Sequence, residues 1–421
     1  MADDYDLLVE DAYLHDRDAT VDIGVRDGHI VDVTETIDGT AVDTIDADGN
    51  LVSPGFVDAH KHLDRGLAAT DGRRPQGNVD PMTHRSYMEL FDEYYERLSH
   101  DELVDRIVEN IEMAVAAGTT HIRSHVTVDH SIGTGTMDAC LEAADRVDDI
   151  VDIELAPSAA RGLLRAGAED AVREAIESAP DDMPVFVGGS ESGRGIRERA
   201  KEFERWFEIA TDYDIGVDVH VSSRESLGIE SLAEIAALTE EYDYGGRVSV
   251  IHAYALAMIP DWWVEEIAGT LRDAGVNVIT CFNSTRSSMP IKEFIGEGAT
   301  LAHGTDNDRD FVVPHGNADS LEAALILSFK LNYGPDTHRP TRDYRWYDTN
   351  EALTLLWEVM TEQGATALGL DGYGIAEGNH ADFVVFDAPS PEWAIIDQAT
   401  RSHVVKDGQV VAEDGTVVAT D

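Results

Sequence analysis

Hydrophobic positions follow two different periods along the chain. Near both ends, apolar and polar residues alternate with a period of two, which is typical of short strands with one buried face. Residues 6–9, 21–26 and 29–33 show this pattern, and so do residues 382–386 and 403–406. Asp-Gly pairs at 27–28, 407–408 and 414–415 are typical of hairpin turns. We therefore expect one small β-sandwich domain formed by both termini, from residues 1–52 and 370–421.

Residues 53–369 alternate instead between apolar strands and helical stretches. One helix is indicated by apolar residues at every fourth position from Leu103 to Val115, with a capping box that begins at Ser99 and a stop at Gly118. Eight strand candidates end near His60, His125, Ala156, Val187, His220, His252, Thr280 and Asp306. Eight strand–helix units predict an α/β fold, a (β/α)8 TIM barrel. Residues 64–98 fit neither pattern, and we expect them to cover the mouth of the barrel.

The acidic composition limits the partners. Among 421 residues, 83 Asp and Glu stand against 31 Lys and Arg, which gives a formal charge of −52. Such a charge argues against nucleic acid or an anionic membrane as a partner. A disordered acidic protein would have the same charge, but 43% hydrophobic residues and strong periodicity favour a folded one. Because like charges repel most at low salt, we expect a halophilic, salt-adapted protein.

The cysteines and the hydropathy bear on location. Cys140 and Cys281 lie far apart, outside any Cys-x-x-Cys motif, so we expect buried thiols in a reducing compartment. No apolar run has transmembrane length, and the first residues do not read as a signal peptide. The sequence therefore predicts a soluble, cytoplasmic protein.

Candidate metal chemistry gathers where the predicted strands end. His60 and His62 lie one residue apart at the end of the first strand, so their side chains point the same way. His220, His252 and Asp306 follow the fifth, sixth and eighth strands. Because strands of a barrel end at the same rim, these groups should converge. Imidazoles with one carboxylate suit a divalent metal that activates water.

This order of residues resembles the amidohydrolase superfamily, and in it most closely the cytosine deaminase-like branch. Residues 123–126, 217–220, 304–307 and 373–379 look like segments of that branch. The resemblance implies that one Zn²⁺ or Fe²⁺ is held by His60, His62, His220 and Asp306. It also implies that Asp306 moves the proton of the attacking water and that His252 polarises the reacting groups. No lysine follows the fourth strand, where bimetal relatives carry a carbamylated lysine, so one metal is expected.

Three positions depart from the cytosine deaminase pattern. Ser223 stands where a proton-shuttling Glu is expected, and Ala160 stands where a Gln reads the pyrimidine. Asn307 replaces an Asp. A shifted loop would allow Glu225 to act instead of the missing Glu. We take Arg161, Ser223 and Asn307 as candidate substrate-binding residues, although an ion pair is the simpler reading of Arg161 in so acidic a chain.

The metal set is intact while the cytosine-reading groups are changed. We therefore predict a metal-dependent hydrolase of a non-peptide C–N bond in a small molecule, in which activated water attacks an amidine or amide carbon. The alternatives are a cyclic-amide or N-acyl hydrolase on the same fold and a catalytically silent binding barrel. The resemblance also allows a homo-oligomer. Lys61, between the two histidines, should point to the opposite strand face and form a structural salt bridge.

Overall fold

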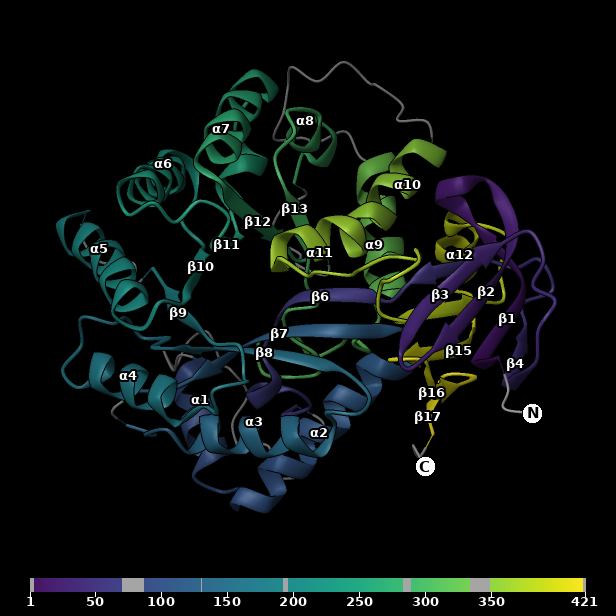
Figure 1. Cartoon of the computed structure of the whole chain (residues 1–421). Coiled ribbons are helices and arrows are strands. Elements are labelled where there is room, and N and C mark those ends of the chain that lie inside the picture. The colour runs from purple at the N-terminus through teal and green to yellow at the C-terminus, as the bar shows by residue number, and fades with distance from the viewer. Residues whose placement is uncertain are drawn as a thin grey trace.

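A computed structural model describes residues 4–69, 87–129, 131–191, 196–282, 289–333 and 349–418. Its centre is a parallel sheet of eight strands in which neighbours in space are neighbours in the chain (Figure 1). The strands are β6 (Phe56–Lys61), β7 (Thr119–Thr127), β8 (Asp152–Ser158), β9 (Phe186–Ser190), β10 (Gly216–Val221), β11 (Val248–His252), β12 (Val276–Thr280) and β13 (Leu301–His303). A parallel bridge from Lys61 to Asp306 joins the first strand to the segment after the last. The predicted (β/α)8 barrel is confirmed.

Helices surround this barrel (Figure 1). They are α1 (Tyr87–Tyr95), α2 (His100–Ala116), α3 (Gly135–Arg146), α4 (Ala168–Ser178), α5 (Ile196–Tyr213), α6 (Glu225–Glu241), α7 (Asp261–Ala274), α8 (Ile291–Gly296), α9 (Ser320–Tyr333), α10 (Thr349–Met360) and α11 (Glu362–Leu368). Short 3₁₀ turns are η1 (His15–Arg17), η2 (Leu63–Arg65) and η3 (Tyr254–Met258). The capping box predicted at Ser99 is present at α2, since Ser99 and Glu102 bond reciprocally. Of the unassigned residues 64–98, residues 70–86 lie outside the described part of the chain.

The two termini build a second unit beside the barrel (Figure 1). One sheet has the order β3-β2-β1-β4 and the other β17-β16-β15-β14-β5. The N-terminal strands are β1 (Tyr5–Leu14), β2 (Ala19–Arg26), β3 (His29–Thr34), β4 (Ala41–Asp46) and β5 (Val52–Pro54), and the C-terminal strands are β14 (Phe383–Phe386), β15 (Arg401–Lys406), β16 (Gln409–Glu413) and β17 (Thr416–Val417). Val9, Ile23, Phe383 and Val405 share one core cluster, so side chains of both sheets pack together. The predicted sandwich is confirmed, and the boundaries at 52 and 370 stay a prediction.

Two local expectations were incomplete. The fourth barrel strand ends at Ser190 and not near Val187, because the Gly188-Gly189 pair continues the strand. A Cβ at Gly189 would lie 2.5 Å from the ring of Trp206, so the glycine marks close packing of a helix on the strand. In the C-terminal flank, helix α12 (Pro391–Asp397) interrupts the strands and begins with Pro391 in its first turn.

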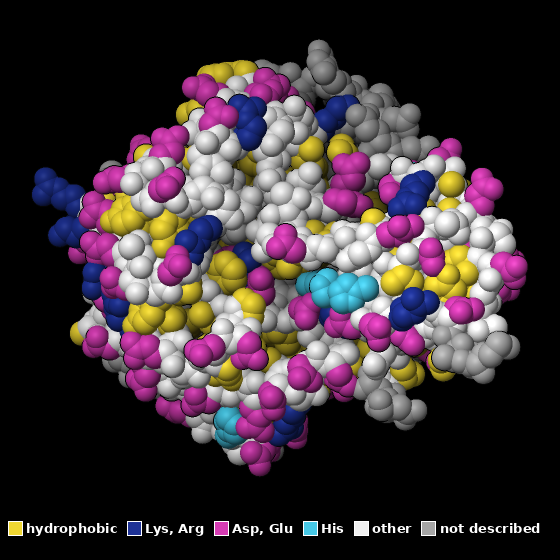
Figure 2. All heavy atoms as spheres, in the orientation of Figure 1, with side chains coloured by type: hydrophobic (Ala, Val, Ile, Leu, Met, Phe, Trp, Pro, Cys, Tyr) yellow, Lys and Arg dark blue, Asp and Glu magenta, His cyan; other side chains and the backbone are white. Residues whose placement is uncertain are grey.

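Acidic side chains are spread over the molecular face seen in Figure 2 and do not form a single patch. On this face, the acidic side chains that contribute to the net charge of −52 are dispersed. Among the described residues, no helix combines the length and the apolar character needed to cross a bilayer.

We predict that salt stabilises the fold. Raising KCl from about 0.1 M to about 1 M shortens the screening length from about 10 Å to about 3 Å. Repulsion between surface carboxylates then falls, and the thermal unfolding midpoint should rise by several degrees. The measurement is calorimetry in KCl and, as a control, in glycine betaine, which does not screen charge. Equal midpoints at both KCl concentrations would contradict the prediction.

Candidate metal centre

The closure of the barrel places Asp306 between His60 and His62. The Asp306 amide donates to the His60 carbonyl at 2.8 Å, and the His62 amide donates to the Asp306 carbonyl at 2.9 Å. Oδ1 of Asp306 consequently lies 3.4 Å from Nε2 of His60 and 3.5 Å from Nε2 of His62. The two strand ends thus present three groups of metal-ligand type to one point.

His220 and His252 reach the same point from β10 and β11. Ligand atoms of His60, His220 and His252 lie within 4.8 Å of one another. Nδ1 of His220 donates to the Gly189 carbonyl at 3.0 Å, which leaves the Nε2 lone pair available. The structure therefore brings together all five residues that the sequence singled out for metal binding and catalysis, whereas their roles stay a prediction.

Burial keeps these imidazoles neutral. Desolvation lowers the pKa of His60, His62 and His220 well below the usual value. Both ring nitrogens of His60 and Nδ1 of His62 are buried without a hydrogen-bond partner. Buried polar atoms without partners are costly, and neutral imidazole is the form that binds metals. Three neutral histidines and one carboxylate fit a single divalent cation such as Zn²⁺ or Fe²⁺.

His252 and Asp306 both adopt left-handed backbone conformations, with φ of 72° and 65°. Such backbone angles are unfavourable for residues with a Cβ. Strained conformations of this kind are concentrated at functional sites. The ring of Tyr254 stacks on His252 with centroids 4.7 Å apart and an interplanar angle of 6°. The amide of Asn307 donates to Oδ1 of Asp306 at 2.6 Å. Asn307 thus holds the carboxylate, and its predicted contact with substrate remains untested.

The backbone of Ser223 interacts with a neighbouring carboxylate, Glu191. Its backbone amide donates to Oε1 of Glu191 at 2.7 Å, and the Ser231 hydroxyl donates to the other oxygen of Glu191 at 3.0 Å. Glu225, the alternative acid, begins α6 and is exposed. Glu225 is thus exposed and not buried with the histidines, and substrate binding by Ser223 stays a prediction.

Arg161 forms the ion pairs that its surroundings suggested. Its guanidinium contacts Asp92 on α1 and Asp129 after β7. Burial opposes its charge, but the hydrogen bonds that it donates to Asp92 and Asp129 raise the pKa of Arg161. Arg161 therefore connects α1 to the loops after β7 and β8, while its predicted contact with substrate stays untested.

Lys61 forms the structural salt bridge that the sequence predicts. Its ammonium contacts Asp308, lies 3.8 Å from Asp58 and donates to the Thr305 hydroxyl at 2.9 Å. Burial opposes its charge, yet Asp308 and Asp58 raise the pKa of Lys61. The buried pair braces the junction of β6 with the segment after β13.

Sequence reasoning assigned no role to His125 or Cys281. The ring of His125 lies 4.5 Å from that of His220 and 4.9 Å from that of His60, centroid to centroid. The Cys281 sulfur and ligand atoms of His252 and Asp306 lie within 4.8 Å of one another. Both residues lie at the ends of predicted strands, and this position was the sequence feature that could have placed them near the cluster. In a further group, His121, Asp152 and Asp382, both carboxylates already pair with the ammonium of Lys406 at 3.2 Å.

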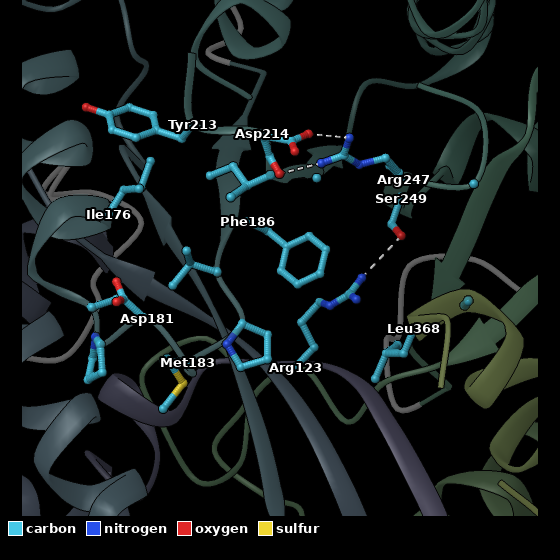
Figure 3. A pocket seen from close by; sticks show the side chains of 18 residues that line it. Arg123, Ile176, Asp181, Met183, Phe186, Tyr213, Asp214, Arg247, Ser249 and Leu368 are labelled. Carbon is cyan, nitrogen blue, oxygen red and sulfur yellow. Dashed lines mark hydrogen bonds and ion pairs between the residues drawn. The ribbon is translucent and has the colours of Figure 1, made fainter. Parts of the chain in front are cut away.

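A cavity of about 540 Å³ opens at the other end of the barrel. Figure 3 shows Arg123 beside Phe186 and directed toward Ser249, with the Asp214–Arg247 pair nearby. Phe186 and Ser249 stand at the amino ends of β9 and β11. Barrel enzymes perform their chemistry at the carboxyl ends, so this cavity is distinct from the histidine cluster.

The model of the amidohydrolase family matches residues 43–188 and 111–412. N-isopropylammelide isopropyl amidohydrolase of Pseudomonas sp. (strain ADP) is 35% identical over 421 residues and is covered, like this chain, over 100% of its length. The chain belongs to the amidohydrolase family. It is a metal-dependent hydrolase of C–N bonds other than peptide bonds, and the predicted membership of the amidohydrolases is confirmed.

Solved structures agree with this assignment. N-isopropylammelide isopropylaminohydrolase of Burkholderia multivorans ATCC 17616 has 25% identity and a TM-score of 0.85, over 98% of this chain and 99% of that chain. 5-Methylcytosine deaminase of Klebsiella pneumoniae, liganded with 5-fluorocytosine, has a TM-score of 0.80 and 22% identity, over 96% and 97%. The second likeness supports the fold.

We predict that Lys61→Met destabilises the protein by about 3–5 kcal/mol, because Asp58 and Asp308 would remain buried without their cation. The measurement is denaturant unfolding of metal-free protein. Lys201→Met removes an exposed lysine from α5 and should change stability little. Equal effects of the two substitutions would show that Lys61 does not brace the closure.

We also predict that metal-free protein loses stability in mild acid. Burial lowers the pKa of His125 and His303 to about 3, so the fold favours their neutral forms. Their contribution is complete above the unfolded pKa of about 6.5 and is lost as the pH falls from there toward 3, by about 1.4 kcal/mol per pH unit for each histidine. Unfolding midpoints that stay constant between pH 7 and 4 would be inconsistent with this account.

Proposed function

We propose that the protein hydrolyses the bond between a ring carbon of a small nitrogen heterocycle and an exocyclic N-alkylamino group, with release of an alkylamine. The observation that carries this proposal is a complete set of metal-type residues beside a changed pocket. Support also comes from a relative of equal length at 35% identity that is named for the hydrolysis of N-isopropylammelide.

In this proposal, His60, His62, His220 and Asp306 hold one Zn²⁺ or Fe²⁺. The bound metal lowers the pKa of water from about 15.7 toward about 7 and so supplies a nucleophile at neutral pH. The Asp306 carboxylate accepts the proton of the attacking water and returns it to the leaving nitrogen. Asn307 orients this carboxylate through its 2.6 Å hydrogen bond. His252, fixed by the Tyr254 ring, donates to the oxygen that gains charge at the ring carbon.

The missing acid favours an alkylamine as leaving group over ammonia from cytosine. Cytosine-type deaminases place a Glu where this chain has Ser223, and Glu191 engages the Ser223 backbone instead. Ala160, where a Gln is expected, offers no side-chain amide for a pyrimidine. A site built without these groups lacks the hydrogen bonds that cytosine requires, which lowers its turnover.

The working environment follows from the charge. We expect the protein to act in a cytoplasm with concentrated salt, since a chain of −52 is self-repelling in dilute buffer. A homo-oligomer is compatible with this proposal.

The direct test is product analysis with metal-loaded protein in high KCl. N-isopropylammelide and related N-alkylamino triazines should yield a free alkylamine, detected by chromatography. Cytosine, cyclic amides and N-acyl amino acids serve as comparison substrates. Robust cytosine turnover, or hydrolysis of cyclic amides alone, would contradict the proposed substrate.

We predict that Asp306→Asn lowers kcat by about 10²–10⁴-fold, the usual contribution of a positioned general acid–base group. The variant should remain folded, because the backbone bonds that close the barrel are retained. Glu225→Gln tests the alternative acid and should leave kcat unchanged, since Glu225 is exposed. A large loss in the Glu225 variant with a normal Asp306 variant would reverse these roles. Metal content is measured for both proteins.

A further inference from the structure

His125 is a buried histidine that the proposed chemistry does not use. Its Nε2 lies 2.8 Å from Oδ1 of Asp218. A carboxylate can only accept a hydrogen bond, so the proton of the neutral His125 ring stands on Nε2. Nδ1 of His125 therefore carries a lone pair, and this atom is buried without a partner.

His60, in contrast, has an N–H group that lacks an acceptor. Its Nε2 faces Asp306 and would bind the metal in the proposed function, so its proton must stand on Nδ1. That Nδ1 is also buried without a partner. A histidine that binds a metal almost always donates its other N–H to an acceptor, which fixes the ring and strengthens the ligand.

The two rings are neighbours in the core of the barrel. Their centroids are 4.9 Å apart at an interplanar angle of 74°. Ligand atoms of His60, His125 and Asp218 lie within 4.8 Å of one another. A buried acceptor and a buried donor, each without a hydrogen-bond partner, thus lie on neighbouring rings.

Asp218 is itself held by an ion pair with Arg123. Oδ2 of Asp218 accepts from Arg123 at 3.2 Å, and Arg123 also donates to Glu154 at 2.6 Å. The Arg123 guanidinium stacks on Phe186 at 3.7 Å from the ring centroid. Because a guanidinium has only donors, Asp218 must keep one oxygen toward Arg123 and the other toward His125.

We propose that His125 is a positioning residue for the metal centre: its Nδ1 accepts the Nδ1–H of His60, and Asp218 fixes the His125 tautomer that makes this bond available. The inference rests on the proposed function only for the metal that His60 binds. A series of hydrogen bonds from Arg123 through Asp218 and His125 to His60 would then couple a buried ion pair to the orientation of a metal ligand. Among the described residues, this series of hydrogen bonds connects the region near the amino ends of the strands to the histidines at their carboxyl ends.

The first test is the affinity for Zn²⁺, measured by competition with a chelator and without substrate. His125→Phe removes the acceptor and should weaken binding about 10–100-fold, the usual cost of losing such a partner. His125→Asn places an amide oxygen near the position of Nδ1 and should restore most of the affinity. His121→Phe is the matched control: His121 is on the same strand, is nearly buried and pairs with Asp152 at 2.9 Å. Its Zn²⁺ affinity should be unchanged.

The second test changes the tautomer and keeps the ring. In Asp218→Asn, Arg123 forces the amide oxygen toward itself, so the amide NH₂ faces His125 and moves the imidazole proton to Nδ1. Two N–H groups would then oppose each other, and Zn²⁺ affinity should fall although His125 is intact. ¹⁵N NMR of the metal-free variant should report Nδ1 protonation of His125, whereas the wild-type protein should report Nε2 protonation.

The outcomes separate the two proposals. Failure of the wild-type protein to bind Zn²⁺ would overturn the proposed function. Wild-type affinity in a folded His125→Phe protein would overturn this inference alone. Loss of affinity in Asp218→Asn with normal affinity in His125→Phe would show that His60 donates to Asp218 directly, which also overturns the role of His125. If His125→Phe does not fold, the Asp218→Asn and His125→Asn proteins decide the question.

Discussion

The candidate site depends on the backbone pairing that closes the barrel. The amide of Asp306 bonds to the His60 carbonyl, and the His62 amide bonds to the Asp306 carbonyl, so the carboxylate is placed between two imidazoles by the backbone itself. Strand β13 approaches β6 so closely that a Cβ at Gly304 would lie 2.5 Å from the His60 carbonyl oxygen. Only glycine permits that approach. The buried Lys61 ion pairs hold the same junction.

Much of this arrangement could be predicted from local patterns. The His-x-His spacing fixes two side chains on one strand face, and the alternation of strands with helices fixes which residues meet at the rim. His125 shows the limit of such reasoning. Its position after the second strand was visible, but its pairing with Asp218 depends on side chains that meet across the barrel interior. The Gly188-Gly189 pair was misread for a related reason, since a Cβ at Gly188 would lie 2.5 Å from the Ala156 carbonyl oxygen and one at Gly189 2.5 Å from the Trp206 ring, and neither contact is visible in the sequence.

Charge is used in two opposite ways in this molecule. Acidic residues outnumber basic ones by 83 to 31, so many surface carboxylates have no matching cation, and we predict that salt screens their repulsion. Inside the barrel, two buried cations have acidic partners: Lys61 faces Asp58 and Asp308, and Arg123 faces Glu154 and Asp218. Removing one partner of such a buried pair is costly, so these interior charges constrain the geometry of the rim. Ser223 and Ala160, which we propose to influence substrate choice, are not members of these ion pairs.

The most direct measurement is anomalous diffraction from crystals of the metal-loaded protein, recorded on both sides of the absorption edge of the metal. The account predicts one strong peak per chain, within coordination distance of His60, His62, His220 and Asp306. A peak at His121, Asp152 and Asp382 alone, or no peak after loading, would contradict it.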